Sequence, residues 1–241
     1  MIQIPISLGF RALVAALVFM AGAMYAQLSQ AYDFALQSQT VRYAVDVAGH
    51  DAGELEVVIE RDGNSIKTTS ISHLSTIAKM FVSGQTVETW FTINGETVQV
   101  EKGQIVSHRN NEVTHAFVID RQAGEIQFTP GESQPASDTE LFESPSFPIV
   151  LMSTPKMKYV HRVPVREINP KKVRWYEYHR VESEMLELNG KTYKTWKITR
   201  NKRGEADRTQ TFWLDRNNYR VPVKIVSVKN KKKTVMTLVS N

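Results

Sequence analysis

Hydrophobic and polar residues alternate along most of the chain beyond residue 40. The clearest case is Thr211–Val228, where Val223 and Ile225 alternate with the polar Lys224. A period of two with β-branched residues is typical of a strand that buries only one of its faces. The Asn217-Asn218 pair favours a turn within the segment. We therefore predict that this segment is a β-hairpin.

The same alternation recurs in Val41–Val47 and Glu54–Glu60, and both Asp62-Gly63-Asn64 and Asn189-Gly190 are hairpin signals. Strands that follow one another at a spacing of about 8–12 residues indicate an antiparallel all-β sandwich or barrel. No amphipathic run is long enough for a helix that would cover the apolar face of the sheet, so that face must fold onto itself. We predict an all-β antiparallel meander that forms a curved half-barrel or barrel.

Residues 129–157 interrupt the meander and contain five prolines. A long irregular connection of this kind is either functional or mobile. Within it, the apolar run Phe147–Met152 predicts that part of the segment packs on the rest of the protein. We expect an irregular insert that acts as a plug or a lid.

Residues 1–31 differ from the rest of the chain. Arg11 is the only charged residue among them, Ala12–Ala26 is uninterrupted and apolar, and Ser29 and Ala31 are small residues at suitable positions for cleavage. A positive start, an apolar run and a small-residue exit are typical of a secretory signal peptide. We predict cleavage after Ala31, which leaves a single all-β domain over residues 32–241.

Two alternatives stay open for this leader, namely cleavage after Ala23 and retention as a membrane anchor. The chain contains no cysteine, so a lipid-anchored precursor, which needs a cysteine at its cleavage site, is excluded. An exported protein without disulfides relies on packing for its stability. We predict a periplasmic protein of a double-membraned bacterium that is not an integral membrane protein once cleaved.

Charge is distributed unevenly between the two halves of the chain. Residues 32–155 contain 7 basic and 17 acidic residues, whereas residues 156–241 contain 22 basic and 8 acidic residues. Such asymmetry indicates an anionic partner, unless the two halves pack together and mix their charges on one surface. Because a meander places sequence halves in sheet halves, we expect one basic side and one acidic side.

Several of these segments together resemble a bacterial export family called domain of unknown function 3108. The resemblance is carried by Tyr43-Ala44-Val45, Ala52-Gly53-Glu54, Trp213-Leu214-Asp215 and Val221-Pro222-Val223-Lys224-Ile225, and it covers Val41 to Val239. The irregular insert departs from the pattern, since it is rich in proline where a clearer short helix is expected. The resemblance implies an exported, mostly antiparallel β protein with no established enzymatic activity. Its implied shape is similar to the curved half-barrels of periplasmic lipoprotein carriers.

Catalytic and metal-binding motifs are incomplete in this chain. Ser153 and Lys156 have the S-x-x-K spacing of a serine acyltransferase, but the companion S-D-N and K-T-G elements are missing. Asn189–Thr192 ends like a phosphate-binding loop, but Met185 stands where that loop requires its first glycine. None of the six histidines is paired at metal-ligand spacing. We therefore predict no catalytic residue, no metal ligand and no cofactor, and a hydrolase is the third hypothesis.

Two groups of residues are candidates for binding. Six aromatic side chains could line an apolar cavity: Tyr43, Phe91, Phe117, Trp175, Trp196 and Phe212. Eight basic side chains could contact an anionic head group: Lys171, Lys172, Arg174, Lys202, Arg203, Lys231, Lys232 and Lys233. An exported protein rarely meets nucleic acid, so we expect no nucleic-acid partner and a lipid or glycolipid ligand instead.

The first functional hypothesis is therefore a non-enzymatic periplasmic binding or carrier protein for an apolar or anionic amphipathic envelope molecule. The alternative is a structural or adaptor protein that docks another cell-envelope protein through a sheet edge or its basic face. A cavity that opens near the basic half of the chain would favour the first hypothesis. The sequence does not identify the ligand or the oligomeric state.

Overall fold

The computed structural model describes residues 37–79, 83–94, 97–136, 142–143, 147–153, 163–169, 172–217 and 221–240. The chain divides into two units, Met1–Phe34 and Ala35–Asn241, and all described residues belong to the second. The predicted signal peptide and Lys171 lie outside the described residues, as do several parts of the predicted insert.

The described residues form one sheet of fifteen strands. The strands are β1 (Gln39–Val47), β2 (His50–Asp62), β3 (Ser65–Leu74), β4 (Gln85–Asn94), β5 (Thr97–Ser107), β6 (Glu112–Asp120), β7 (Glu125–Thr129), β8 (Gln134–Pro135), β9 (Phe142–Glu143), β10 (Val163–Asn169), β11 (Lys172–Leu188), β12 (Lys191–Lys202), β13 (Glu205–Asp215), β14 (Pro222–Lys229) and β15 (Lys232–Ser240). Neighbouring strands are antiparallel, apart from the parallel pair β9 and β10. The predicted antiparallel meander is confirmed.

Local sequence explains the individual hairpins. Phe212 on β13 pairs with Ile225 on β14, which confirms the hairpin predicted for this segment. Asn189 and Gly190 connect β11 to β12 with φ angles of 51° and 75°. Two consecutive left-handed residues match the right-handed twist of the flanking strands, and asparagine and glycine tolerate that conformation best.

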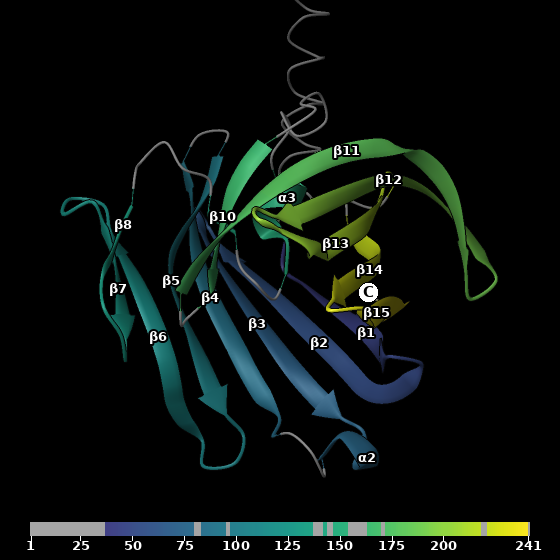
Figure 1. Ribbon diagram of the computed structural model, residues 1–241, viewed down its shortest axis with the longest axis horizontal. Helices are drawn as coiled ribbons and strands as arrows, with labels where there is room; N and C mark the ends of the chain where they lie inside the picture. The colour runs from purple at the N-terminus through teal and green to yellow at the C-terminus, as the bar shows by residue number, and fades with distance from the viewer. Residues whose placement is uncertain are drawn as a thin grey trace, which may run out of the picture. The chain divides into compact units, whose positions relative to one another are not determined.

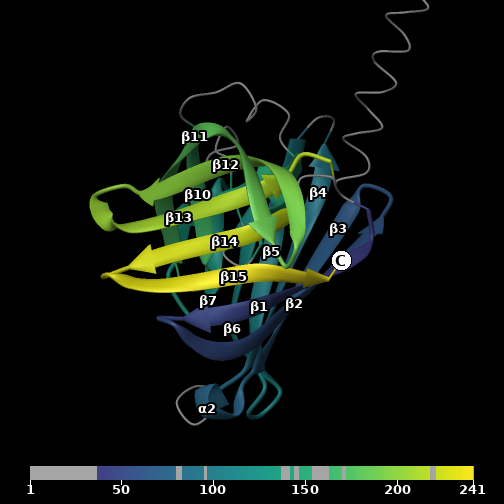
Figure 2. The same cartoon turned by 90° about the vertical axis from the view of Figure 1, so that its right-hand side faces the viewer.

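The strand order is β8 to β1 followed by β15 to β9, so the chain's first and last strands meet in the middle of the sheet. Figure 2 shows β15 between β14 and β1. The acidic half of the sequence therefore builds β8 to β1, and the basic half builds β15 to β10, whereas the two-residue β9 comes from the acidic half and pairs with β10.

The sheet curls without closing (Figure 1), which confirms a curved half-barrel. Its two ends are the short strands β8 and β9. Near this opening, Arg166 of β10 donates a 2.8 Å hydrogen bond from Nη1 to the carbonyl oxygen of Pro135 in β8. This side-chain contact links the two ends of the sheet where backbone pairing stops.

The inside of the curve is filled by part of the predicted insert. Phe147 and the one-turn helix α3 (Ile149–Ser153) are buried, and the Phe147 ring lies 6.2 Å from the ring of Tyr43. The apolar run therefore packs against the sheet, as its composition predicts. A second short helix, α2 (Thr76–Lys79), has no buried residue. Within the described residues, neither helix has the length and apolar character to cross a membrane.

Candidate anion-binding pocket

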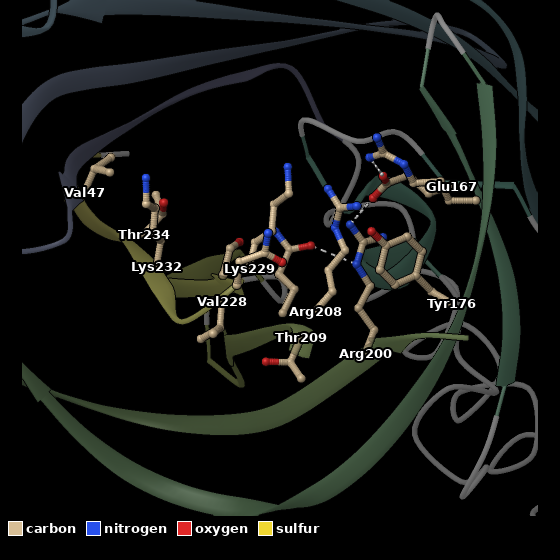
Figure 3. Close-up of a pocket in the computed structure, with 14 residues that line it drawn as sticks. Val47, Glu167, Tyr176, Arg200, Arg208, Thr209, Val228, Lys229, Lys232 and Thr234 are labelled. Atoms are coloured by element: carbon tan, nitrogen blue, oxygen red, sulfur yellow. Dashed lines mark hydrogen bonds and ion pairs between the residues drawn. The ribbon is translucent and has the colours of Figure 1, made fainter. Parts of the chain in front are cut away.

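A cavity of about 540 Å³ lies on the inner face of the basic half of the sheet (Figure 3). Strands β1 and β10 to β15 contribute its walls. Its lining includes five basic side chains and one carboxylate, which are Arg174, Arg200, Arg208, Lys229, Lys232 and Glu167. Uncharged polar residues, among them Gln210, Ser227 and Thr234, and the apolar Val47 complete much of the rest.

Strand register arranges the inner face of β13, β14 and β15 in three rows. The basic row is Arg208, Lys229 and Lys232, which pair with one another across the strands. The neutral polar row is Gln210, Ser227 and Thr234. The apolar row is Phe212, Ile225 and Met236.

These rows follow from the period of two. Phe212 and Leu214 are buried on β13, so Arg208 and Gln210, four and two positions before Phe212, point to the same face. Each step of two residues along a strand advances about 7 Å, so the basic row lies about 13 Å from the apolar row. The inner surface thus changes from charged to neutral polar to apolar, from the strand ends toward the core.

One side of the pocket is built around a buried ion pair between Arg200 and Glu167. These residues are 2% and 4% exposed, and Arg200 Nη2 donates a hydrogen bond to Glu167 Oε2. Arg200 also donates from Nη1 to the Tyr178 hydroxyl at 3.3 Å and from Nε to Gln210 Oε1 at 2.8 Å. Every nitrogen of the guanidinium is therefore committed to a protein partner, which fixes the wall.

Aromatic rings surround the same guanidinium. Its central carbon lies 4.5 Å from the centroid of the Tyr176 ring and 5.5 Å from that of Phe212. Such contacts attract a cation to the ring face. Burial raises the pKa of the Tyr176 hydroxyl, the charge of Glu167 raises it further, and the nearby arginines act in the opposite direction. Tyr176 is therefore a neutral hydrogen-bond donor at pH 7.

The other basic side chains of the pocket are less well compensated. Arg174 Nη1 lies 3.7 Å from Glu167 Oε1, and its Nε is buried with no hydrogen-bond partner among the described residues. Arg208 Nη1 lies 3.7 Å from Glu205 Oε2, a carboxylate that also pairs with Lys202.

The two lysines complete the basic row at the rim. Lys229 and Lys232 are exposed, and neither forms an ion pair with any residue in the described part of the chain. Figure 3 shows their side chains and that of Arg208 extending toward the same open space. The pocket therefore carries an excess of positive charge.

Only some of the eight predicted basic residues lie at this pocket. Arg174 and Lys232 line the pocket, and Lys202 lies beside it through its pairing with Glu205. The remaining described side chains are exposed outside the lining, namely Arg203, Lys231 and Lys233. Lys171 and the side chain of Lys172 lie outside the described part of the structure.

The six predicted aromatic residues are not brought together, and none lines this pocket. One core cluster contains Tyr43, Phe91 and Phe117. A second contains Phe212, with Trp196 packed against it. Trp175 alternates with the inward-facing Arg174 and Tyr176, so it lies on the opposite face, where the Arg166 guanidinium stacks on its ring at 4.4 Å.

Sequence reasoning missed four charged residues of the pocket, which are Glu167, Arg200, Arg208 and Lys229. The density of positive charge along the chain favours the lysine-rich turns instead. The informative signal is the strand phase, because Arg200 lies two positions after the buried Ile198, and Arg208 lies four positions before the buried Phe212, so each points to the same face as its core neighbour. A charged residue in phase with core residues, near a strand end, is expected at the mouth of a cavity.

The S-x-x-K spacing of Ser153 and Lys156 gains no support from the described residues. The buried Ser153 hydroxyl donates a 3.0 Å hydrogen bond to the carbonyl oxygen of Val150, and Lys156 lies outside the described residues. Within the described ranges, no group of three or more histidine, aspartate or glutamate side chains is placed to hold a metal ion.

Comparison of the sequence with protein families gives a match over residues 42–237 to the family described as "Protein of unknown function (DUF3108)". The chain belongs to this family. A comparison with curated proteins finds no match. Membership agrees with the resemblance inferred from the first and last strands.

Solved structures show what this fold is similar to. A β-barrel-like protein of domain of unknown function DUF1849 from Brucella abortus has a TM-score of 0.55 at 9% identity, and the match covers 85% of this chain and 97% of that one. A putative outer membrane lipoprotein-sorting protein domain from Vibrio parahaemolyticus has a TM-score of 0.34 at 12% identity, over 89% and 88% of the two chains. The first match supports the β-barrel-like fold and carries no information on the ligand.

Proposed function

We propose that this chain is a non-enzymatic periplasmic binding or carrier protein for an anionic amphipathic envelope molecule. The observation that carries the proposal is the order of the three rows on the inner face, from basic through neutral polar to apolar. A ligand with an anionic head and a hydrocarbon chain has the same order of chemistry along its length. Its head would lie among the basic residues, and its chain would extend toward the core.

Electrostatics favours the placement of the head. An anion near the basic row is attracted by the two exposed lysines and by Arg208, whose side chain is partly removed from water, where charge interactions are stronger than at an open surface. The buried pair of Arg200 and Glu167 keeps one wall rigid, so little ordering is needed on binding. Lys229 and Lys232 at the exposed rim would attract the anion during approach.

The apolar end of the path is occupied by the protein itself. Leu151 of α3 belongs to the same core cluster as Phe212 and Ile225 of the apolar row. A hydrocarbon chain that enters from the pocket would therefore compete with Leu151. Helix α3 thus serves as an internal plug, which fills the apolar end of the path when no ligand is bound.

Docking of another protein at a sheet edge is less well supported. The edge strands of the described sheet, β8 and β9, have two residues each. Short edge strands offer few free backbone groups for strand addition. We therefore place the carrier ahead of the adaptor.

Native mass spectrometry of the protein purified from the periplasm tests this function. We expect a bound species that organic solvent releases, and we expect its loss from the variant Arg208→Gln/Lys229→Gln/Lys232→Gln. The matched control is Arg203→Gln/Lys231→Gln/Lys233→Gln, which removes the same charge from exposed positions outside the lining. Consistently empty protein, or equal loss from both variants, would rule the proposal out.

A further inference from the structure

We propose that the head group bound here is a phosphate monoester or diphosphate, a group with two or more negative charges, attached to an apolar chain. This inference rests on the proposed function and specifies the class of its ligand. It starts from the number of positive charges that the pocket leaves uncompensated.

The pocket's own carboxylate does not neutralise the basic row. Glu167 is engaged by Arg200, which hydrogen-bonds to it, and by Arg174 at 3.7 Å. Both partners lie on β11 and β12, away from β14 and β15. The negative charge of Glu167 therefore compensates Arg200 and Arg174 and is not available to the basic row.

The basic row places like charges directly opposite one another. Arg208 pairs with Lys229, and Lys229 pairs with Lys232, on three adjacent strands. Neighbouring strands lie about 4.8 Å apart, and like charges in directly opposed positions are destabilising. Packing gives no reason for this arrangement, because the two lysines are exposed. A polyanion that lies across the row would offset the repulsion.

The charge count favours a dianion over a monoanion. Arg208 shares Glu205 with Lys202, whereas Lys229 and Lys232 have no carboxylate partner in the described part of the chain. A head with a single charge would leave at least one of the two lysines uncompensated. A phosphate monoester at pH 7 carries about −1.5 to −2 charges and three strong acceptor oxygens, which suits a row of cationic donors.

The neutral polar row fits the next part of such a head. Ser227 and Thr234 lie about 7 Å from the basic row, and each has a hydroxyl group that can donate a hydrogen bond. An ester oxygen or a second phosphate group would reach this level when the terminal phosphate lies on the basic row. The apolar row beyond it argues for an attached hydrocarbon chain and against a free inorganic polyanion.

Isothermal titration calorimetry of the periplasm-purified protein, after any bound species has been extracted and the loss has been checked by native mass spectrometry, distinguishes these ligands. The probes are decyl phosphate and decyl sulfate, which have the same chain but differ in head charge, and inorganic pyrophosphate, which has no chain. At pH 7.5 and below the micelle concentration, we expect decyl phosphate to bind at least about tenfold more tightly than decyl sulfate. We expect pyrophosphate to bind more weakly than decyl phosphate.

A change of pH tests the charge directly. The second pKa of a phosphate monoester is about 6, so at pH 5 decyl phosphate is a monoanion and should lose its advantage over decyl sulfate. The charged and titratable groups that face the pocket are Glu167, Arg174, Tyr176, Arg200, Arg208, Lys229 and Lys232, and none is a histidine. Decyl sulfate reports any change in the protein itself, because its own charge stays constant.

Variants assign the preference to the basic row. Lys229→Gln/Lys232→Gln should bind the two decyl probes with affinities within about threefold, whereas the control Lys231→Gln/Lys233→Gln should keep the preference. Equal affinities of the natural protein for both decyl probes would overturn this inference but leave the proposed function intact. If pyrophosphate binds most tightly, the inference that the phosphate is attached to an apolar chain is wrong. If neither decyl probe binds, the proposed function is wrong.

Discussion

The hydroxyl of Tyr43 on β1 donates a 2.8 Å hydrogen bond to the carbonyl oxygen of Pro222 on β14. The two strands are not neighbours, since β15 lies between them in the sheet. Tyr43 is fully buried, so this bond connects β1 to β14, the two neighbours of β15, inside the core. If either the Tyr43 hydroxyl or the Pro222 carbonyl is removed, the other cannot form a hydrogen bond with water instead, because both are buried.

The first prediction concerns this bond. Tyr43→Phe removes the donor and leaves the buried Pro222 carbonyl unsatisfied, which should lower the free energy of unfolding by about 1–3 kcal/mol. Equilibrium unfolding in urea measures the change. Tyr193→Phe is the control, because the partly exposed Tyr193 ring contacts Lys191 and should change stability by less than about 0.5 kcal/mol. Equal effects of the two substitutions would contradict the assigned role of the bond.

The second prediction concerns alkaline pH. Burial raises the pKa of Tyr43 well above 10.0. The unfolded chain therefore releases this proton at a lower pH than the folded protein does. The stabilising contribution is fully present below the unfolded pKa and is lost as pH rises through the folded value. Urea midpoints between pH 9 and pH 11.5 should fall, and they should fall less steeply for Tyr43→Phe; identical slopes would contradict this explanation.

The third prediction concerns the buried ion pair. Glu167→Gln leaves the guanidinium of Arg200 buried without its counter-charge and should cost about 3–5 kcal/mol of unfolding free energy. The double variant Glu167→Leu/Arg200→Met removes both charges and should recover most of that loss. For comparison, Glu56→Gln breaks an exposed 2.8 Å pair with Arg42 and should cost at most about 1 kcal/mol. A double variant as unstable as Glu167→Gln would contradict this account.

Local sequence was sufficient to predict much of this fold. Alternation in Val41–Val47 and the turn at Asn189-Gly190 depend on near neighbours, and the structure confirms both a strand and a hairpin there. The pairing of β1 with β15 could not be predicted in the same way. It joins Val47 to Thr234, and such long-range register depends on the whole sheet and not on any local pattern.

The pocket was predicted in part, for a related reason. Charge counts identified the basic half of the chain, but they do not distinguish Lys231, which is exposed in a turn, from Lys232, which lines the cavity. Only the register between strands places Arg208, Lys229 and Lys232 in one row. The engagement of Glu167 with Arg200 joins β10 to β12 across β11, and no spacing in the sequence reveals it.

The fourth prediction concerns the plug. Leu151→Ala empties space beside Phe212 and Ile225 and should lower the free energy of unfolding by about 2–5 kcal/mol. The same space should admit a hydrocarbon chain, so we expect decyl sulfate to bind more tightly to this variant than to the natural protein. Met185→Ala, at a side chain that is 60% exposed, is the control for both measurements. Loss of stability without tighter binding would argue that the chain of the ligand takes another path.

The fifth prediction concerns the leader. Intact-mass measurement of the protein from the periplasmic fraction should give a chain that begins at Tyr32, because Ser29 and Ala31 provide the small residues for cleavage. Ala31→Arg should block that cleavage and leave the protein in the membrane fraction. A chain that begins at Met24 would indicate the alternative site after Ala23, and an uncut chain would indicate a retained anchor.

The meeting of β1 and β15 in the middle of the sheet also determines the order in which the protein can fold. Within β1 to β8 and within β10 to β15, strands that follow one another along the chain are paired, so each set can assemble locally. The seam between the sets needs the earliest and the latest strands together, and such distant pairings form slowly. During synthesis the two halves of the half-barrel can therefore join only after β15 has been made. The cationic pocket beside that strand is among the last features to be completed.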